Sequence, residues 1–330
     1  MRKHLWIGYL LAAVCLYYAF RGISFREFGE TLSEADVRWV LLAVGLGVLN
    51  YYLRSVRWAI LIRPVQIISS QALFWPLVIG FFANNVLPLR MGEIVRAHVC
   101  GKKFNISRTA SLGSIFLERI CDTLSFLTTF LVASFFYPFP SYMEKGAWML
   151  GGACLVAIGL LLWIRRYESV FHKILEWSRL PPTWRGRVKH VTTHFIHSTS
   201  GITQPRYIAE AMALSLTIWV IEGTFLYLMA RAFTIPLNYA ESFFLLFALG
   251  LSVTLPQAPG YVGTFEFFGV TALTLLGISK NQGLPLVLAV HGTQFTLVAI
   301  MGSLGLWREG LTFRQLTSTK SDVSESAPGA

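Results

Sequence analysis

Two hydrophobic stretches of this chain are interrupted by a Leu-Pro pair followed by a glycine and a glutamate. The first reads Asn84-Asn85-Val86-Leu87-Pro88-Leu89-Arg90-Met91-Gly92-Glu93. The second reads Thr254-Leu255-Pro256-Gln257-Ala258-Pro259-Gly260-Tyr261-Val262-Gly263-Thr264-Phe265-Glu266. A helix broken inside a bilayer survives only where the break is buried in protein or lines a wet cavity. Broken segments at corresponding places in two halves therefore predict a transport site between them.

The composition places the chain in a membrane. Hydrophobic residues make up 54% of the 330 residues and charged residues only 14%, against about 25% charged in soluble domains. Basic residues outnumber acidic ones by 28 to 17, but they are grouped in short loops between apolar runs. This grouping is typical of cytoplasmic loops that face anionic lipid. We therefore expect membrane lipids, and no nucleic acid, as partners.

No cofactor or metal site is predicted. The four cysteines are scattered without paired spacing, so neither a disulfide framework nor a metal knuckle is indicated. The chain also lacks the glycine-rich Lys-Ser/Thr loop that binds nucleotide phosphates. A built-in ATP motor is therefore not expected.

About six apolar runs are predicted to cross the membrane fully, and their lengths run from 15 to 29 residues, against the roughly 20 that a spanning helix needs. The first follows a basic start without a cleavage site, so we expect it to be retained as an anchor. Basic edges place both termini in the cytoplasm. The six runs are Leu5–Phe20, Trp39–Leu53, Thr109–Tyr137, Gly146–Ile164, Ile208–Ala230 and Leu286–Trp307.

The two interrupted stretches are predicted to be re-entrant hairpins. Ala72–Leu89 has basic residues at both ends, and a simple crossing would place one of these clusters outside, against the charge bias. A hairpin that enters and leaves from the cytoplasm avoids this, with Asn84, Asn85 and the Leu-Pro pair in its turn. Leu245–Leu276 is its counterpart, entered from outside and broken between Pro256 and Gly263.

The predicted fold is an all-α polytopic membrane protein in which six crossings and two hairpins form an inverted repeat. The repeat units are 38–137 and 207–307, within a single domain 1–314. A basic cytoplasmic segment, 165–206, separates the units, and the tail 315–330 is expected to be disordered. Inverted repeats place the binding site between the halves, near the midplane. The residues that break the hairpins are Asn84, Asn85, Pro88, Gly92, Pro256, Pro259, Gly260 and Gly263.

Three charged residues are predicted to lie at membrane depth. Glu118 is about 14 Å into its helix at 1.5 Å per residue, near the middle of a hydrocarbon layer about 30 Å thick. Glu118 and Asp122 share a helix face, and Arg119 reaches Asp122 at i+3. Each isolated charge there costs about 2.5–3.5 kcal/mol. The three side chains either join helices through an internal salt bridge or line a hydrated path, and these roles are compatible.

Other ionisable residues flank the breaks. Arg90, Glu93 and Arg96 follow the first break, and Glu93 and Arg96 are close enough in sequence to pair. They form either a solvated helix start or a site where arginine binds a lipid phosphate. Glu266 and Glu222 are lone acids in the second half. His291, in the last span, is either a packing residue or the partner of the Glu118–Asp122 face.

The two interruptions and the intervening Glu118-Arg119-Ile120-Cys121-Asp122 together resemble the lysylphosphatidylglycerol synthase transmembrane-region family, also described as flippase-like membrane proteins. The resemblance covers about residues 5–310. In the bifunctional synthases of this family, the module resembles the part that moves lipid between leaflets, and aminoacyl transfer belongs to a separate soluble domain. Only 23 residues follow Trp307, so we expect that domain to be lacking here.

Three functions follow as hypotheses. The leading one is a lipid translocase of a bacterial or archaeal inner membrane, which is not an enzyme and acts on a lipid with an anionic or phosphate headgroup. The second is a membrane partner subunit of a separately encoded lipid-modifying enzyme or glycosyltransferase. The third is an enzyme acting on lipid at the membrane surface. The substrate-path or headgroup residues are predicted to be Arg90, Glu93, Arg96, Glu118, Arg119, Asp122, Glu266 and His291.

Overall fold

The computed structural model describes the chain except for residues 1, 88–90, 137–140, 168–203, 255–257 and 313–330. The described residues form helices and contain no β-strand, as expected for an all-α protein. The elements are α1 (Arg2–Phe20), α2 (Phe25–Ser33), α3 (Val37–Ile62), α4 (Ser70–Val86), α5 (Gly92–Phe104), α6 (Arg108–Ser134), α7 (Ser141–Arg166), α10 (Pro205–Ala232), α11 (Tyr239–Thr254), the short 3₁₀ turn η3 (Pro259–Tyr261), α12 (Thr264–Leu275) and α13 (Lys280–Arg308). Most of the predicted basic segment 165–206, and the whole of the predicted tail 315–330, lie outside the described residues.

Three of the described helices are long and apolar enough to cross a membrane, namely α3, α10 and α13. They correspond to three of the six predicted crossings, although each is longer than its predicted run. Helices α1, α6 and α7 occupy the other three positions, and their crossing of the bilayer stays a prediction.

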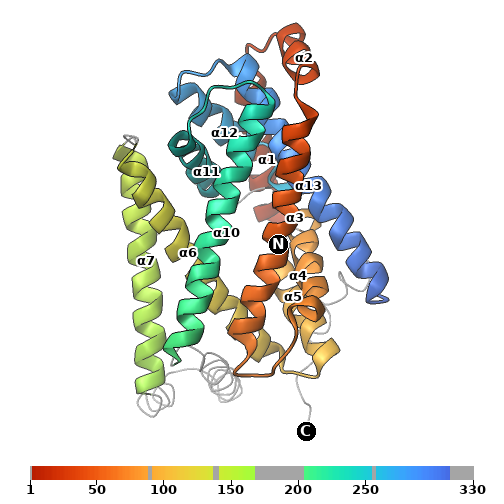
Figure 1. Cartoon of the computed structure of the whole chain (residues 1–330), viewed down its shortest axis with the longest axis vertical. Coiled ribbons are helices and arrows are strands. Elements are labelled where there is room, and N and C mark those ends of the chain that lie inside the picture. Colours follow the sequence, from red (N-terminus) through yellow and green to blue (C-terminus); the bar gives the residue numbers. More distant parts are fainter. Residues whose placement is uncertain (1, 88–90, 137–140, 168–203, 255–257, 313–330) are drawn as a thin grey trace.

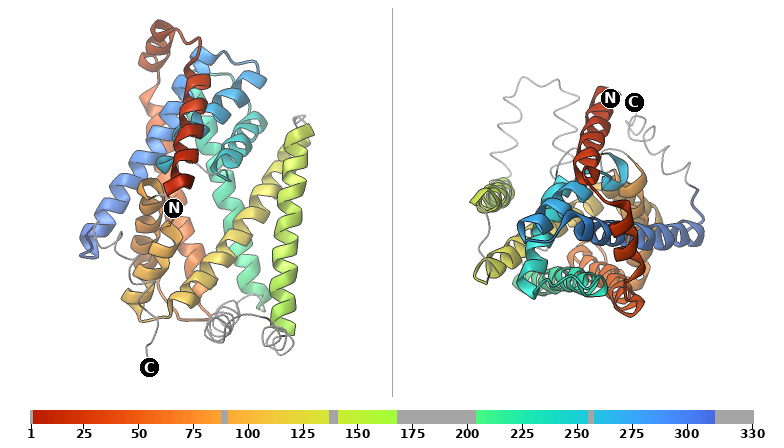
Figure 2. Two further views of the ribbon diagram at one scale, coloured as in Figure 1. Left: turned by 180° about the vertical axis from the view of Figure 1, so that it is seen from behind. Right: turned by 90° about the horizontal axis from the view of Figure 1, so that it is seen from above.

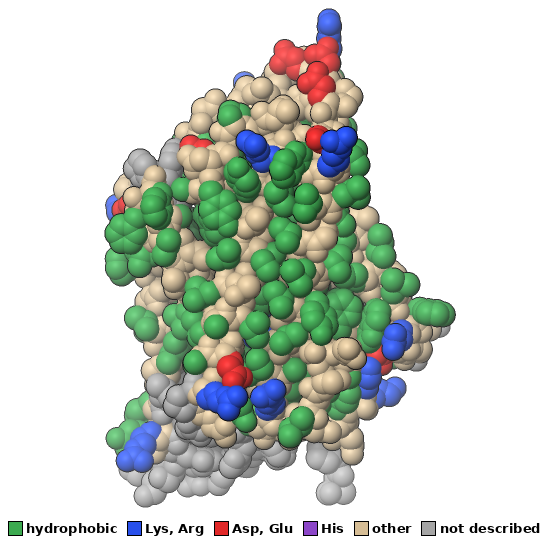
Figure 3. Space-filling model, viewed as in Figure 1, with side chains coloured by type: hydrophobic (Ala, Val, Ile, Leu, Met, Phe, Trp, Pro, Cys, Tyr) green, Lys and Arg blue, Asp and Glu red, His purple; other side chains and the backbone are tan. Residues whose placement is uncertain are grey.

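The surface has the pattern of a protein embedded in lipid. Figure 3 shows hydrophobic side chains over the middle of the visible face, with charged side chains gathered toward its two ends. Large apolar side chains such as Leu41, Trp148 and Ile300 are exposed. Exposed apolar surface on this scale is unusual for soluble monomers and indicates contact with lipid.

Helices α3 and α10 pack against each other and run antiparallel (Figure 1). At one end, the Asp36 N–H donates to the Ala232 carbonyl at 2.8 Å. At the other end, the Arg63 guanidinium lies over the Tyr207 ring, 5.7 Å from its centroid. Helix α7 stands at the edge of the bundle and packs on α6 (Figures 1 and 2).

The first interruption joins α4 and α5, which pack as an antiparallel pair. The predicted turn is wrong in its placement: Asn84 and Asn85 lie in the last helical turn of α4, and Pro88 lies outside the described residues. The return arm is α5, because the Asn84 side-chain oxygen accepts from the Gly92 N–H at 2.7 Å and starts a new helix there. A side chain at Gly92 would collide with the Gly80 carbonyl, so glycine permits the close approach of the arms.

The second interruption joins α11 and α12, which also pack against each other. Gly260 and Gly263 have φ of 72° and 93°, values that glycine adopts without steric cost. Gly263 also lies against the backbone of Ala12 on α1, where a Cβ has no room. Pro259 begins η3, and Pro256 lies outside the described residues.

The α4–α5 pair and the α11–α12 pair lie toward opposite ends of the molecule (Figure 1). The 3₁₀ turn η3 packs against α4, and the Gly260 backbone lies close to the Asn85 carbonyl. The end of α4 and the η3 turn therefore meet between the two helix pairs.

The turns that follow the hairpins are built alike. In both, the first residue has positive φ, 54° and 82°. The isoleucine N–H groups donate to carbonyls five residues earlier, at 3.2 and 2.9 Å. The serine hydroxyls cap the next helix by accepting from N–H groups three residues later, at 3.0 and 3.4 Å. These turns are Asn105-Ile106-Ser107, before α6, and Gly277-Ile278-Ser279, before α13.

Candidate functional site

A cavity of about 390 Å³ lies between the two hairpin turns and the long helices. Its lining comes from α3, the end of α4, α6, α10, α11, the η3 turn, α12 and α13, with Leu150 from α7. Residues from both predicted repeat units, 38–137 and 207–307, therefore line the cavity. Its strongly polar or charged lining residues are Arg54, Asn84, Asn85, Arg119, Asp122, Thr123, His291 and Gln294.

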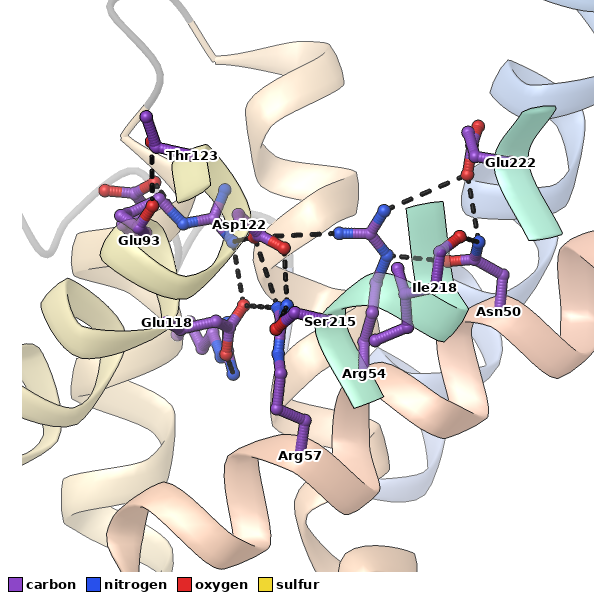
Figure 4. A network of polar contacts seen from close by, with 12 residues as sticks. Asn50, Arg54, Arg57, Glu93, Glu118, Asp122, Thr123, Ser215, Ile218 and Glu222 are labelled. Carbon is purple, nitrogen blue, oxygen red and sulfur yellow. Dashed lines mark hydrogen bonds and ion pairs between the residues drawn. The ribbon is translucent and has the colours of Figure 1, made fainter. Parts of the chain in front are cut away.

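Glu118 and Asp122 form ion pairs with four arginines, namely Arg54, Arg57, Arg96 and Arg119. Figure 4 shows the two carboxylates with Arg54 and Arg57. Their i, i+4 spacing places both carboxylates on one face of α6. Arg96 of α5 donates to both oxygens of Glu118, at 3.0 and 2.7 Å. Arg57 of α3 donates to both oxygens of Asp122 and to the Ser215 hydroxyl. The carboxylates thus join three helices.

Burial makes this network an obligatory set of partners. The Arg57 and Glu118 side chains are fully buried, with 0% exposure, and they lie 3.2 Å apart. Taking an ion out of water costs several kcal/mol, which attraction offsets only where geometry and extra hydrogen bonds are good. Removal of one partner therefore leaves an uncompensated charge.

Arg119 connects the network to the cavity. Its Nη2 donates to Glu118 at 2.7 Å and lies 3.0 Å from Asp122. Its Nε is 3.8 Å from Glu93. The side chain is 34% exposed, in contrast to Arg57, and it lines the cavity.

A second polar group links α3, α10 and α13. Asn50 donates to Glu222 at 3.0 Å and to the Ile218 carbonyl at 3.0 Å. The Gln294 side chain donates to the other Glu222 oxygen at 2.7 Å. Arg54 donates from Nε to Asn50 at 2.7 Å, and its terminal nitrogens point between Glu222 and Asp122 (Figure 4).

A third polar group fixes the start of α12. Glu266 accepts from the Gly263 N–H at 2.6 Å, which caps the helix. Its other oxygen lies 2.5 Å from Nδ1 of His291. Nε2 of His291 lies 2.8 Å from the Gly260 carbonyl. The histidine of α13 thus joins the η3 turn to the first turn of α12.

The lysylphosphatidylglycerol synthase TM region family matches residues 5–302 of this chain. The chain belongs to this family. The resemblance inferred from the two interruptions and the acidic–arginine motif is therefore confirmed.

Relatives of this family member include archaeal membrane proteins. A UPF0104 membrane protein of Methanothermobacter thermautotrophicus is 24% identical over 298 residues, covering 84% of this chain and 87% of that protein. A second one from the same organism is 25% identical, covering 81% and 82%. Glycosyltransferase AglD of Haloferax volcanii is 23% identical, covering 90% of this chain but only 53% of AglD. No solved structure matches the chain.

In this family member, the predicted site residues divide into groups. Glu118, Arg119 and Asp122 form one network with Arg96, and the predicted Arg119–Asp122 pair is present. Glu266 and His291 form a separate pair, so His291 does not face the Glu118–Asp122 pair. Both groups border the same cavity. Arg90 lies outside the described residues.

Two expectations for the segment after the first interruption are wrong. Arg96 is buried and bound to Glu118, so it is neither a solvated residue at a helix start nor free to bind lipid phosphate. Glu93 does not close on Arg96, and its nearest recorded charge is Arg119. The reason is that α5 returns through the protein and packs against α6.

The sequence interpretation missed Arg54 and Arg57, because it ended the second predicted crossing at Leu53. Both lie inside α3, and Arg57 is among the largest fully buried side chains. One signal was available: the apolar run continues past Arg57 through Trp58-Ala59-Ile60-Leu61-Ile62. Charges within such a run face the bundle interior or a wet cavity.

Proposed function

We propose that this chain moves a lipid between leaflets by admitting its headgroup to the central cavity while the acyl tails stay in the bilayer. The carrying observation is the 390 Å³ cavity, which both halves of the chain line and which holds Arg54, Arg119 and Asp122. Polar cavities at broken helices near the midplane are the recurring site of transporters.

The arrangement of the helices supports a re-entrant, inverted-repeat architecture as part of this proposal. Helices α3–α6 and α10–α13 follow the same order of long helix, hairpin and long helix. The first helices of the two units, α3 and α10, run antiparallel. In each unit, the second hairpin arm bonds to the following long helix, through Arg96–Glu118 in one and Glu266–His291 in the other. The units are those predicted at 38–137 and 207–307.

The charge distribution supports one orientation of the protein across the membrane. The acidic α2 lies at one end of the molecule, and the basic α4–α5 end lies at the other (Figures 1 and 3). We place the basic end on the cytoplasmic side of a bacterial or archaeal inner membrane.

A cavity-filling substitution tests the translocase function. In liposomes with fluorescently labelled phospholipid, we expect the wild-type chain to speed leaflet exchange over protein-free vesicles. Thr123→Trp places an indole in the cavity and should remove most of this exchange. Thr128→Trp is the matched control, because Thr128 makes the same bond to its own helix but is exposed. Wild-type exchange equal to that of empty vesicles would contradict the proposal.

A second function is favoured by one comparison. AglD is named a glycosyltransferase, and this chain spans about half of its length. We propose as the alternative that the chain serves a separately encoded glycosyltransferase or lipid-modifying enzyme as its membrane partner, supplying the lipid. Transport is proposed in preference to catalysis by the chain itself. Transfer of label from a nucleotide sugar to lipid by the purified chain alone would contradict that choice.

A further inference from the structure

Four carboxylates around the central cavity have partners within the protein on both of their oxygens. Glu118 has three arginines within 3.2 Å. Asp122 is bound by Arg57 and lies 3.0 Å from Arg119. Glu266 accepts from Gly263 and contacts His291.

Glu222 completes this set. It accepts from Asn50 and Gln294, one on each oxygen. A cationic headgroup entering the cavity would need an acceptor with a free lone pair and charge. Each of these four acids already has protein partners on both of its carboxylate oxygens, and these partners would compete with such a cation.

The guanidinium donors are in the opposite condition. Arg54 makes its hydrogen bond through Nε alone, to Asn50. Its Nη1 is 3.9 Å from Asp122 and its Nη2 is 3.8 Å from Glu222. Both distances exceed a hydrogen bond, whose N···O separation is about 2.7–3.2 Å. Among the described residues, the terminal nitrogens of Arg54 are therefore attracted by two carboxylates but donate a hydrogen bond to neither.

Arg119 adds a second donor to the same place. Its Nη2 and the Nη1 of Arg54 both approach Oδ2 of Asp122, at 3.0 and 3.9 Å. Within the described part of the chain, Nη1 of Arg119 makes no recorded hydrogen bond. The two guanidinium groups thus face one anionic point at the cavity wall.

Aromatic rings form much of the remaining wall, including Tyr51, Phe81, Trp219, Tyr261 and Phe295. Ring faces also attract cations, but the Phe81 face is already occupied by the Arg54 guanidinium, 5.7 Å from its centroid. Rings around a guanidinium lower the local dielectric and strengthen its attraction for an anion.

We propose that Arg54 and Arg119 bind the phosphate of the lipid headgroup, and that the cavity selects lipids of neutral or negative net charge over cationic, aminoacylated ones. This inference rests on the proposed translocation and names its substrate class. Guanidinium groups bind phosphate through two parallel hydrogen bonds. Asp122 holds the two arginines in place until the phosphate arrives.

Two labelled lipids with the same tails test the selectivity in the liposome assay. We expect phosphatidylglycerol to exchange about tenfold faster than lysylphosphatidylglycerol, the value of roughly one charge-assisted hydrogen bond. Arg54→Gln should slow phosphatidylglycerol exchange by about the same factor. Arg308→Gln is the control, because this exposed guanidinium lies outside the cavity over Trp75. Equal or faster exchange of the lysyl lipid would overturn the inference while leaving translocation standing.

A binding measurement separates this inference from the proposed function. Short-chain phosphatidylglycerol and its lysyl ester are titrated against the full chain in detergent by calorimetry, with Arg54→Lys as a folded variant that retains charge. Tighter binding of phosphatidylglycerol, weakened in Arg54→Lys, supports the inference even if neither lipid exchanges. Equal binding of the two lipids overturns it. Inorganic phosphate is titrated alone, and binding as tight as that of the lipid would overturn the lipid as the source of the phosphate.

Discussion

Arg57 of α3 and Asp122 of α6 face each other inside the protein. Nη1 of Arg57 donates to Oδ1 of Asp122, and Nη2 donates to Oδ2. This two-point contact places α3 and α6 in register beside the cavity. Because the same Arg57 also lies near Glu118, one side chain balances two buried carboxylates. Four predictions follow from this and related contacts.

Arg57→Met should destabilise the protein strongly. The substitution leaves Asp122 and Glu118 buried with fewer counter-charges, for which the expected loss is about 3–5 kcal/mol. Thermal unfolding in detergent measures the change. The double variant Arg57→Met with Asp122→Asn removes the stranded charge and should recover part of the stability. If the Arg57→Met variant alone were as stable as the wild type, the charge of Asp122 would be balanced by groups other than Arg57, which would contradict this prediction.

His291→Phe should loosen the turn between α11 and α12. The imidazole contacts both Glu266 and the Gly260 carbonyl, so its loss leaves a buried carboxylate short of one partner, at about 1–3 kcal/mol. Hydrogen exchange followed by mass spectrometry should show faster exchange in residues 258–266 and little change in α5. Unchanged protection of 258–266 would argue against His291 as the anchor.

Gly92→Ala should destabilise the α4–α5 hairpin. A Cβ at this position meets the Gly80 carbonyl and the Asn84 side chain, and overpacking of this kind costs about 1–3 kcal/mol. Gly152→Ala is the matched control, since nothing lies within 4 Å of a Cβ built at Gly152. The melting temperature of the first variant should fall, and that of the control should hold or rise. Equal melting temperatures of the Gly92→Ala and Gly152→Ala variants would mean that α4 and α5 can move apart to make room for the added methyl group.

Single cysteines at Ser33 and Gln66 should label from opposite sides of the membrane. Both positions are exposed, whereas the four native cysteines are buried, which keeps the background low. A membrane-impermeant maleimide added to intact cells should modify Ser33→Cys, and Gln66→Cys only after the cells are opened. Labelling of both from one side would contradict the proposed orientation.

Much of the helical plan was predictable from local sequence. The apolar runs predicted α3, α10 and α13, because a bilayer demands long uninterrupted apolar helices. The Leu-Pro and glycine breaks predicted that helices end near Val86 and restart near Thr264. Their boundaries were less certain: Asn84 and Asn85 read as turn formers but remain helical, because the Asn84 side chain caps α5 while its backbone stays within α4.

The candidate site was only partly predictable. The i, i+3 and i, i+4 spacings placed Glu118, Arg119 and Asp122 together, since helix geometry alone brings them onto one face. Nothing local indicated that Arg57 and Arg96, 65 and 22 residues away from their carboxylate partners, would complete the network. The positive-inside rule gave no sign that these arginines are buried, because it weighs charge and not contact.

The sequence by itself determined that this is a helical membrane protein with two broken segments and charges at depth, because hydrophobicity and helix periodicity are local properties. Only the tertiary structure decided which charges meet, which of them face the cavity, and that Arg96 is consumed in an ion pair while Arg54 keeps donors to spare. Ion pairing depends on which helices pack together, and that packing is set by the whole bundle.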